Sequence, residues 1–299
     1  MRPQADNASR NPHRPRPATL GPVQPGVPEI QPEARGDTQS NGNGTIVVKI
    51  GGSTLGEHDT ALDDVVALQR QGVQVVVVHG GGKVISEWME RQGVRPRFVR
   101  GLRVTDARSL EIVVAVLTGL INKSLVVSIQ KLGGRAMGIS GADGGMLEAR
   151  VKDPELGLVG EVVKVNPGPI KAVVAADCIP VIAPVAVQAE IETSAEPLLN
   201  VNADTVAGQV AAALGADRLV FLTDVEGVLD SSRRLIPRLT VRQARGLLHS
   251  NIVAGGMIPK LEGCLTALDR GGVAQIVDGR RAHALMDLLS GEVMGTRVG

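Results

Sequence analysis

From Thr45 onward, short apolar runs rich in β-branched residues alternate with longer segments in which apolar residues recur at helical spacing. The short runs predict strands over Ile46–Ile50, Val73–Val78, Ala136–Ile139, Ile179–Ile182, Leu219–Leu222 and Val273–Val277. The longer segments predict helices over Thr60–Gln71, Val84–Gln92, Ala107–Leu132, Ile170–Ala176, Ala203–Leu214 and Lys260–Gly271. This order of elements indicates repeated strand–helix–strand units.

The predicted strands are continuously apolar instead of alternating between apolar and polar residues. Such strands are buried on both faces, so helices must cover both sides of the sheet. We therefore predict an α/β fold with a mainly parallel sheet. The helix predicted over Ala107–Leu132 is apolar over more of its surface than one sheet face requires. It is either a deeply buried core helix or also packs against a second subunit.

The first 43 residues differ from the rest, with eight prolines, five arginines and few apolar residues. They lack the apolar core of a secretion signal, and we predict a disordered tail over residues 1–44. No apolar run approaches the roughly 18–20 residues that span a bilayer. We therefore expect a cytoplasmic protein that does not contact a membrane.

Composition narrows the classes of function further. The formal net charge is +1, and the chain has two Phe, one Trp and no Tyr. This argues against nucleic-acid binding, which uses basic patches and aromatic stacking platforms. Cys178 and Cys264 lie far apart with no zinc-type spacing, which indicates inert thiols and no metal site built from cysteine.

Ligands of parallel sheets bind at the carboxyl ends of the strands, and two glycine-bearing turns follow predicted strands here. In "VVKIGGSTL", Lys49 ends a strand just before Gly51 and Gly52, and it either reaches solvent or faces a ligand. In "VVHGGGKV", three glycines either form a tight turn or let backbone N–H groups meet an anion at a helix N-terminus. Neither turn matches the P-loop or GxGxxG patterns.

Further polar groups gather at other predicted element ends. "LLNVNADTVAG" crowds Asn200, Asn202, Asp204 and Thr205 in front of a helix, and an N-cap would explain only one of them. Other candidates lie in "GGMIPKLEGC" with Lys260, "LVFLTDVEGVLD" with Thr223 and Asp224, and "RGLRVTD" with Arg103. A guanidinium such as that of Arg103 can bind a carboxylate through two parallel bonds.

Taken together and in order, VVKIGGS, VVHGGGK, GLRVTD, NVNADT, FLTDVEGVLD and GGMIPK resemble the amino acid kinase family from about Thr45 to the C-terminal "MGTRV". The resemblance implies a three-layer αβα sandwich with two lobes. Residues 45–214 would bind an acylated amino acid, and residues 215–299 would bind ATP.

The resemblance also implies residue roles and is strongest to the branch that phosphorylates the side-chain carboxylate of N-acetyl-L-glutamate in arginine biosynthesis. Lys49 and Lys260 would flank the transferring phosphoryl group, with Asp204 holding both. The substrate would bind Gly81, Gly82, Arg103 and Asn200. The nucleotide would bind Gly51, Gly52, Thr223 and Asp224, with Mg²⁺ carried on its phosphates and no metal held by protein ligands alone.

Two alternatives stay open from the sequence. One is a carrier-protein-linked aminoadipate kinase of lysine biosynthesis, against which the intact "HGGGK" and compact "RGLRVTD" argue. The other is a catalytically silent regulatory binding protein on the same fold, against which the intact Lys49, Asp204 and Lys260 argue.

The resemblance covers both arginine-inhibited hexamers, linked by an extra N-terminal helix, and uninhibited dimers. Pro22, Pro25, Pro28 and Pro32 would each break such a helix, at a cost of about 3 kcal/mol apiece. We therefore expect a homodimer joined partly through Ala107–Leu132, with little response to arginine.

Overall fold

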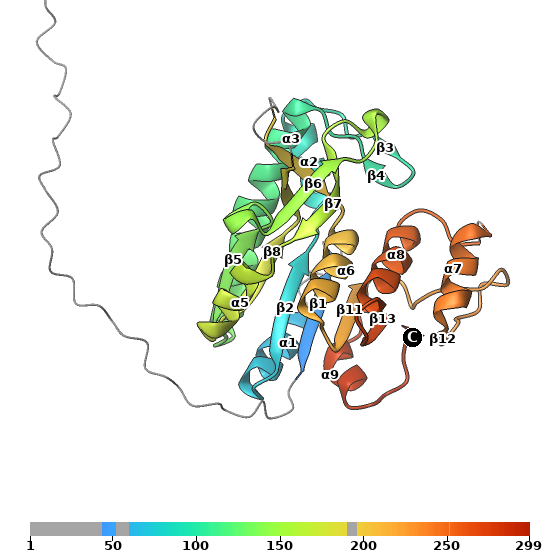
Figure 1. The fold of residues 1–299 in the computed structure, drawn as a ribbon. Helices are drawn as coiled ribbons and strands as arrows, with labels where there is room; N and C mark the ends of the chain where they lie inside the picture. The colour runs from blue at the N-terminus through green and yellow to red at the C-terminus, as the bar shows by residue number, and fades with distance from the viewer. Residues whose placement is uncertain (1–43, 52–59, 190–195, 251) are drawn as a thin grey trace, which may run out of the picture. The chain divides into compact units, whose positions relative to one another are not determined.

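All six predicted strands lie in one sheet of the computed structural model, which describes residues 44–51, 60–189, 196–250 and 252–299. They are β1 (Thr45–Ile50), β2 (Gln74–His79), β5 (Ala136–Ser140), β8 (Ile179–Ala183), β11 (Arg218–Thr223) and β13 (Val273–Asp278). Their order is β13-β11-β1-β2-β8-β5, and all neighbours in this run are parallel. The predicted α/β fold with a mainly parallel sheet is confirmed (Figure 1).

Two further strands complete the sheet at the edge next to β13. β14 (Thr296–Val298) pairs antiparallel with β13, and β12 (Arg238–Leu239) pairs parallel with β14. With two and three residues, these strands are too short to leave an apolar run, so the pattern did not predict them.

Four other strands form a small closed unit beside the main sheet. They are β6 (Leu147–Val151), β7 (Val159–Val165), β9 (Val185–Gln188) and β10 (Leu198–Val201). β7 alternates between buried and exposed residues over much of its length, so it lacks the continuous apolar run of the central strands. A separate two-stranded hairpin consists of β3 (Phe98–Val99) and β4 (Leu102–Arg103).

Helices cover both faces of the main sheet. Their bounds are α1 (Ala61–Arg70), α2 (Gly82–Arg91), α3 (Ala107–Val114), α4 (Asn122–Lys131), α5 (Gly168–Ala175), α6 (Ala203–Leu214), α7 (Val241–His249), α8 (Met257–Leu268) and α9 (Ala284–Leu289). One core contains side chains of α1, α2, α3, α4 and α9, and the other contains side chains of α5, α6, α7 and α8. Alternate residues of β1 and β2 enter the two cores, which is why these strands are continuously apolar.

The helix predicted over Ala107–Leu132 is continuous to Lys131 but contains a π-helical segment, Ala115–Ile121, between α3 and α4. Residues on its inner side, such as Val113 and Leu117, are buried, whereas Leu120 is 42% exposed and Val127 is 47% exposed. One 18-residue window has a mean hydropathy of 2.1. The expectation that no segment reaches membrane-spanning length therefore needs correction for this helix, although core helices pass the same test.

The predicted tail, residues 1–44, lies outside the described residues except for Gly44. The prolines expected to prevent a linking helix lie outside them as well. Strands from both predicted lobes, 45–214 and 215–299, belong to the same eight-stranded sheet. The division into an amino-acid lobe and a nucleotide lobe stays a prediction.

Candidate active site

A cavity of about 300 Å³ opens at the carboxyl ends of β1, β2 and β11. Of the predicted site residues, the following line it: Lys49, Gly51, Gly81, Gly82, Arg103, Asn200, Asp204, Thr223, Asp224 and Lys260. Gly52 lies outside the described residues. Residues that are far apart in the sequence therefore meet where ligands of parallel sheets bind.

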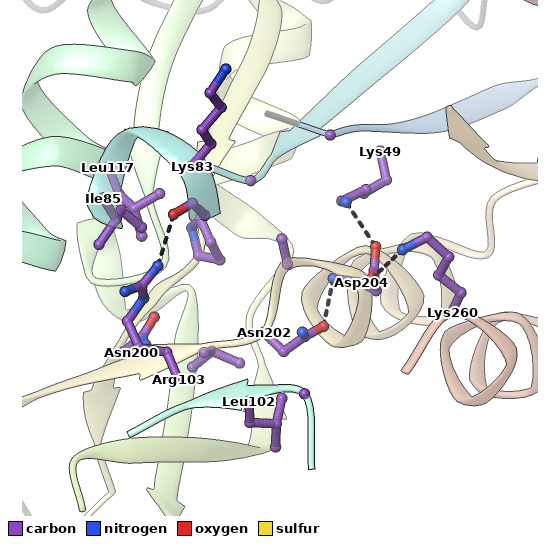
Figure 2. A pocket seen from close by; sticks show the side chains of 18 of the residues that line it. Lys49, Lys83, Ile85, Leu102, Arg103, Leu117, Asn200, Asn202, Asp204 and Lys260 are labelled. Carbon is purple, nitrogen blue, oxygen red and sulfur yellow. Dashed lines mark hydrogen bonds and ion pairs between the residues drawn. The ribbon is translucent and has the colours of Figure 1, made fainter. Parts of the chain in front are cut away.

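Asp204 lies between two lysines in the lining of this cavity, as Figure 2 shows. Its Oδ1 is 2.9 Å from Lys49 Nζ, and its Oδ2 is 3.1 Å from Lys260 Nζ. The side chains of Asp204, Lys49 and Lys260 are only 7%, 9% and 13% exposed. Ion pairs this deeply buried are costly to desolvate, so this geometry is unusual for a purely structural contact.

The alternation of side chains along β1 explains how a lysine enters this interior. Val47 and Lys49 point to the same face of the sheet, and Val47 packs in the core that contains α6 and α8. Lys49 therefore points toward Asp204 on α6 rather than to solvent. The solvent-exposed alternative for this lysine is wrong.

At the beginning of α6, one polar residue of "NVNADT" caps the helix and the others do not. Asn202 is the N-cap, and its Oδ1 accepts hydrogen bonds from the backbone N–H groups of Asp204 and Thr205 at 2.9 and 3.1 Å. Because Asn202 caps the helix, the side chains of Asp204 and Asn200 remain available to the cavity. The expectation that capping explains only one of these residues is confirmed.

Two glycines allow α6 and α8 to approach each other closely. A Cβ at Gly208 would lie 2.6 Å from Gly263 Cα, and a Cβ at Gly263 would lie 2.7 Å from the Asp204 carbonyl oxygen. Gly208 lies one turn after Asp204, and Gly263 lies nearly one turn after Lys260. This contact therefore sets the spacing that lets Lys260 reach Asp204.

The ionisation of Asp204 follows from its surroundings. Burial alone would raise its pKa, but the charges of Lys49 and Lys260 oppose burial and hold the pKa below its ordinary value. Asp204 is consequently an anion at neutral pH. It can hold two cations in place but is poorly suited to accept a proton.

The triple-glycine turn joins β2 to α2, with Gly81 at the N-cap position. A Cβ at Gly81 would lie 2.5 Å from Ile121 Cδ1 and 2.9 Å from Leu117 Cδ2, whereas a Cβ at Gly82 would meet nothing within 4 Å. The immediate reason for glycine at position 81 is therefore packing against the π-helical segment. Of these two positions, only Gly82 has the open space that direct contact between a ligand and the backbone requires.

The Arg103 guanidinium is held directly against this turn. Its Nη2 donates to the Gly82 carbonyl oxygen at 2.8 Å and to Ser86 Oγ at 2.9 Å. The guanidinium carbon lies 4.8 Å from the centre of the Phe98 ring, and burial lowers the pKa of Arg103. Ser86 was not predicted from the sequence, because a serine inside a helix carries no local signal.

Asn200 and Arg103 are linked by a residue that sequence reasoning missed. Asn200 Nδ2 donates to Thr105 Oγ1 at 3.1 Å, and Thr105 Oγ1 donates to the Arg103 carbonyl oxygen at 3.1 Å. Thr105 is fully buried. The sequence could have indicated Thr105, because it lies in the same "RGLRVTD" motif as Arg103.

Thr223 ends β11, Asp224 follows it, and both line the cavity. The Thr223 hydroxyl donates to Asp224 Oδ1 at 3.3 Å. Within the described part of the chain, no group of three or more His, Cys, Asp or Glu is arranged to hold a metal ion. Asp204, the other carboxylate of the cavity, is already paired with two lysines.

Comparisons with known proteins agree with this architecture. The sequence profile of the amino acid kinase family matches residues 44–278. Acetylglutamate kinase of Bradyrhizobium diazoefficiens is 43% identical over 288 residues, which cover 90% of this chain and 96% of that protein. Acetylglutamate kinase of Dehalococcoides mccartyi is 41% identical over 257 residues, which cover 86% of this chain and 94% of that protein. The crystal structure of smu.665 from Streptococcus mutans UA159 superposes with a TM-score of 0.72 at 29% identity. The superposition covers 85% of this chain and 98% of that one.

Proposed function

The chain belongs to the amino acid kinase family, and we propose that it transfers the γ-phosphoryl group of ATP to the side-chain carboxylate of N-acetyl-L-glutamate. The product is N-acetyl-L-glutamyl 5-phosphate, an intermediate of arginine biosynthesis. Full-length similarity to proteins named acetylglutamate kinase supports this substrate. The observation that carries the mechanism is the buried Lys49–Asp204–Lys260 arrangement.

The reaction needs electrostatic help more than proton transfer. A side-chain carboxylate is already ionised at neutral pH, so it attacks phosphorus without a general base. An oxygen–phosphorus bond forms as the bond to the β-phosphate oxygen breaks, and ADP leaves with that electron pair. The catalytic problem is to bring two anions together and to stabilise charge on the phosphoryl oxygens.

The charges of the cavity suit this task. Its described lining carries four cationic side chains, Lys49, Lys83, Arg103 and Lys260, and two carboxylates, Asp204 and Asp224. In our proposal, Lys49 and Lys260 contact the transferring group, and Asp204 keeps both ammonium groups in position before the substrates arrive. Such preorganised charges stabilise a transition state without reorganising during the reaction.

The remaining residues divide between the two substrates. Arg103, Asn200 and the backbone of Gly81 and Gly82 would bind the acylated amino acid, because they lie together on one side of the cavity. Gly51, Gly52, Thr223 and Asp224 would bind the nucleotide. Mg²⁺ would arrive on the ATP phosphates, because the cavity has too few uncommitted carboxylates to hold it alone.

An assay of ADP release with several acceptors tests this proposal. N-acetyl-L-glutamate, glutamate, aspartate and aminoadipate are compared at equal concentration with MgATP. We expect turnover with N-acetyl-L-glutamate at least about a hundredfold above the others, since a site built for one acyl group leaves polar groups unpaired with the wrong ligand. Preference for aminoadipate would favour the lysine-pathway alternative, and no turnover with any acceptor would favour the silent binding protein.

A further inference from the structure

His79 is a buried titratable residue with no part in the mechanism above. It is the last residue of β2, it directly precedes the triple glycine, and it is completely buried. Its side chain enters the core on the side of α4, away from Asp204, because it lies on the same face of the strand as Val75 and Val77. It therefore lies behind the glycine turn rather than inside the cavity.

The partners of the imidazole determine where its proton is. His79 Nδ1 lies 3.0 Å from the Gly80 carbonyl oxygen, which can only accept a hydrogen bond. His79 Nε2 lies 3.2 Å from Asn122 Nδ2, which can only donate. Both contacts are satisfied by a single state, a neutral ring with its hydrogen on Nδ1.

The orientation of Asn122 is determined independently of the histidine. Its Nδ2 donates to the Val181 carbonyl oxygen at 2.9 Å, and its Oδ1 accepts from Lys123 Nζ at 3.0 Å. A Cβ at Gly138 would lie only 1.9 Å from Asn122 Oδ1, so glycine at position 138 makes room for the amide. Groups from β5, β8 and α4 thus present an N–H group of Asn122 to His79.

We propose that His79 is a positioning residue that fixes the triple-glycine turn by donating from Nδ1 to the Gly80 carbonyl oxygen. The N–H of Gly80 is already bound to the Ile50 carbonyl oxygen of β1 at 3.0 Å. The bond from His79 therefore holds the carbonyl group of Gly80, so that both backbone polar groups of Gly80 are held in place. Two residues later, the Gly82 carbonyl oxygen accepts from Arg103, so the position of the turn also determines the position of the guanidinium.

The surroundings keep the imidazole of His79 uncharged at neutral pH. Burial, together with the nearby charges of Lys49 on β1 and Lys123 on α4, lowers the pKa of His79 to about 4, although its bond to Gly80 opposes this shift. A protonated ring would point an Nε2–H group at the N–H group of Asn122. Neutrality is therefore required by the geometry as well as by the charges.

Two substitutions separate the two halves of the imidazole. His79→Asn places an amide donor near the position of Nδ1, and His79→Gln places an amide oxygen near the position of Nε2. This inference rests on the proposed reaction, so KM for N-acetyl-L-glutamate and for ATP are measured in both variants and in the wild type. We expect His79→Gln to raise KM for the acylated amino acid roughly tenfold with KM for ATP unchanged, and His79→Asn to stay within about twofold. Equal changes in both variants, or a parallel rise in KM for ATP, would overturn the proposal.

A spectroscopic measurement tests the proton position without relying on activity. The chain has five histidines, and the signals of His79 in ¹⁵N ring spectra of the wild type are those absent from the His79→Gln variant. We expect the pattern of a neutral ring protonated on Nδ1, unchanged between pH 8 and about pH 5.5. A ring protonated on Nε2, or titration near pH 6.5, would overturn the proposal even if the wild type phosphorylates N-acetyl-L-glutamate. Failure of that turnover alone would overturn only the proposed function.

Discussion

At the scale of single residues, we propose that Asp204 acts through the two lysines that it holds. Replacing Lys49 or Lys260 by Ala removes one cation beside the transferring group, and we expect kcat to fall by about 10²–10³. Steady-state rates and circular dichroism of each variant check this, with Lys164→Ala as a matched control because its ammonium is exposed and paired with Glu148. Near-normal kcat in either folded variant would contradict the assigned roles.

A substitution at Gly81 tests whether glycine is needed there for packing in the core or for contact with the substrate. Gly81→Ala should lower turnover because its Cβ would collide with Ile121 Cδ1 and Leu117 Cδ2. Ile121→Val removes that Cδ1, so the double variant should recover part of the lost kcat and of the lost stability. If Gly81→Ala loses turnover without losing stability, the added Cβ obstructs the substrate instead of the core side chains.

His79 also makes stability depend on pH. Its pKa is about 4 in the folded protein and 6.5 ordinarily, so the unfolded chain binds more protons between these values. The free energy of unfolding should therefore be fully retained above pH 6.5 and fall toward pH 4, by at most about 3 kcal/mol. Urea unfolding at pH 7.5 and 5 should show a larger loss for wild type than for His79→Gln, in which other titrating groups are unchanged. Equal losses would show that the buried imidazole does not titrate as described.

At the scale of elements, the spacing of α6 and α8 determines whether Lys260 reaches Asp204. Gly208→Ala places a Cβ against the backbone of Gly263, so the helices must separate. We expect a loss of roughly 1–3 kcal/mol in the free energy of unfolding and a lower kcat, with KM for N-acetyl-L-glutamate nearly unchanged. Gly246→Ala in α7 is the matched control, because its Cβ meets nothing within 4 Å, and it should add up to about 1 kcal/mol of stability. A Gly208→Ala protein with wild-type kcat would show that this helix spacing does not govern catalysis.

At the scale of the whole molecule, the outer face of the long helix and the edge strand β5 offer an apolar surface. Leu120, Val127 and Met137 are each more than 40% exposed there. We expect this surface to join two copies of the chain, with little response to arginine. Light scattering should give a dimer mass with and without millimolar arginine, and Leu120→Glu should shift it toward the monomer. A hexamer mass or cooperative inhibition by arginine would contradict this prediction.

The sequence predicted the central sheet well because its six parallel strands are buried on both faces and leave continuous apolar runs. It did not predict β3, β4, β6, β7, β9, β10, β12 or β14, which are short or, like β7, partly exposed. The motifs predicted that Lys49, Asp204 and Lys260 belong to one site. The structure shows how they meet: β1 directs Lys49 inward, and the close contact of α6 and α8 brings Lys260 to Asp204. The sequence did not single out Thr105, Ser86, His79 or Asn122, because their importance comes from partners 17 to 95 residues away and hence from the fold.

The central claim, phosphoryl transfer to a carboxylate, is tested most directly by trapping the product. An acyl phosphate reacts with hydroxylamine to give a hydroxamate, which is identified by mass spectrometry, and ADP is measured in the same samples. With MgATP and N-acetyl-L-glutamate, we predict the side-chain hydroxamate in a one-to-one ratio to ADP, and none with Lys49→Ala on the same timescale. ADP release from the wild type without any hydroxamate would contradict the account.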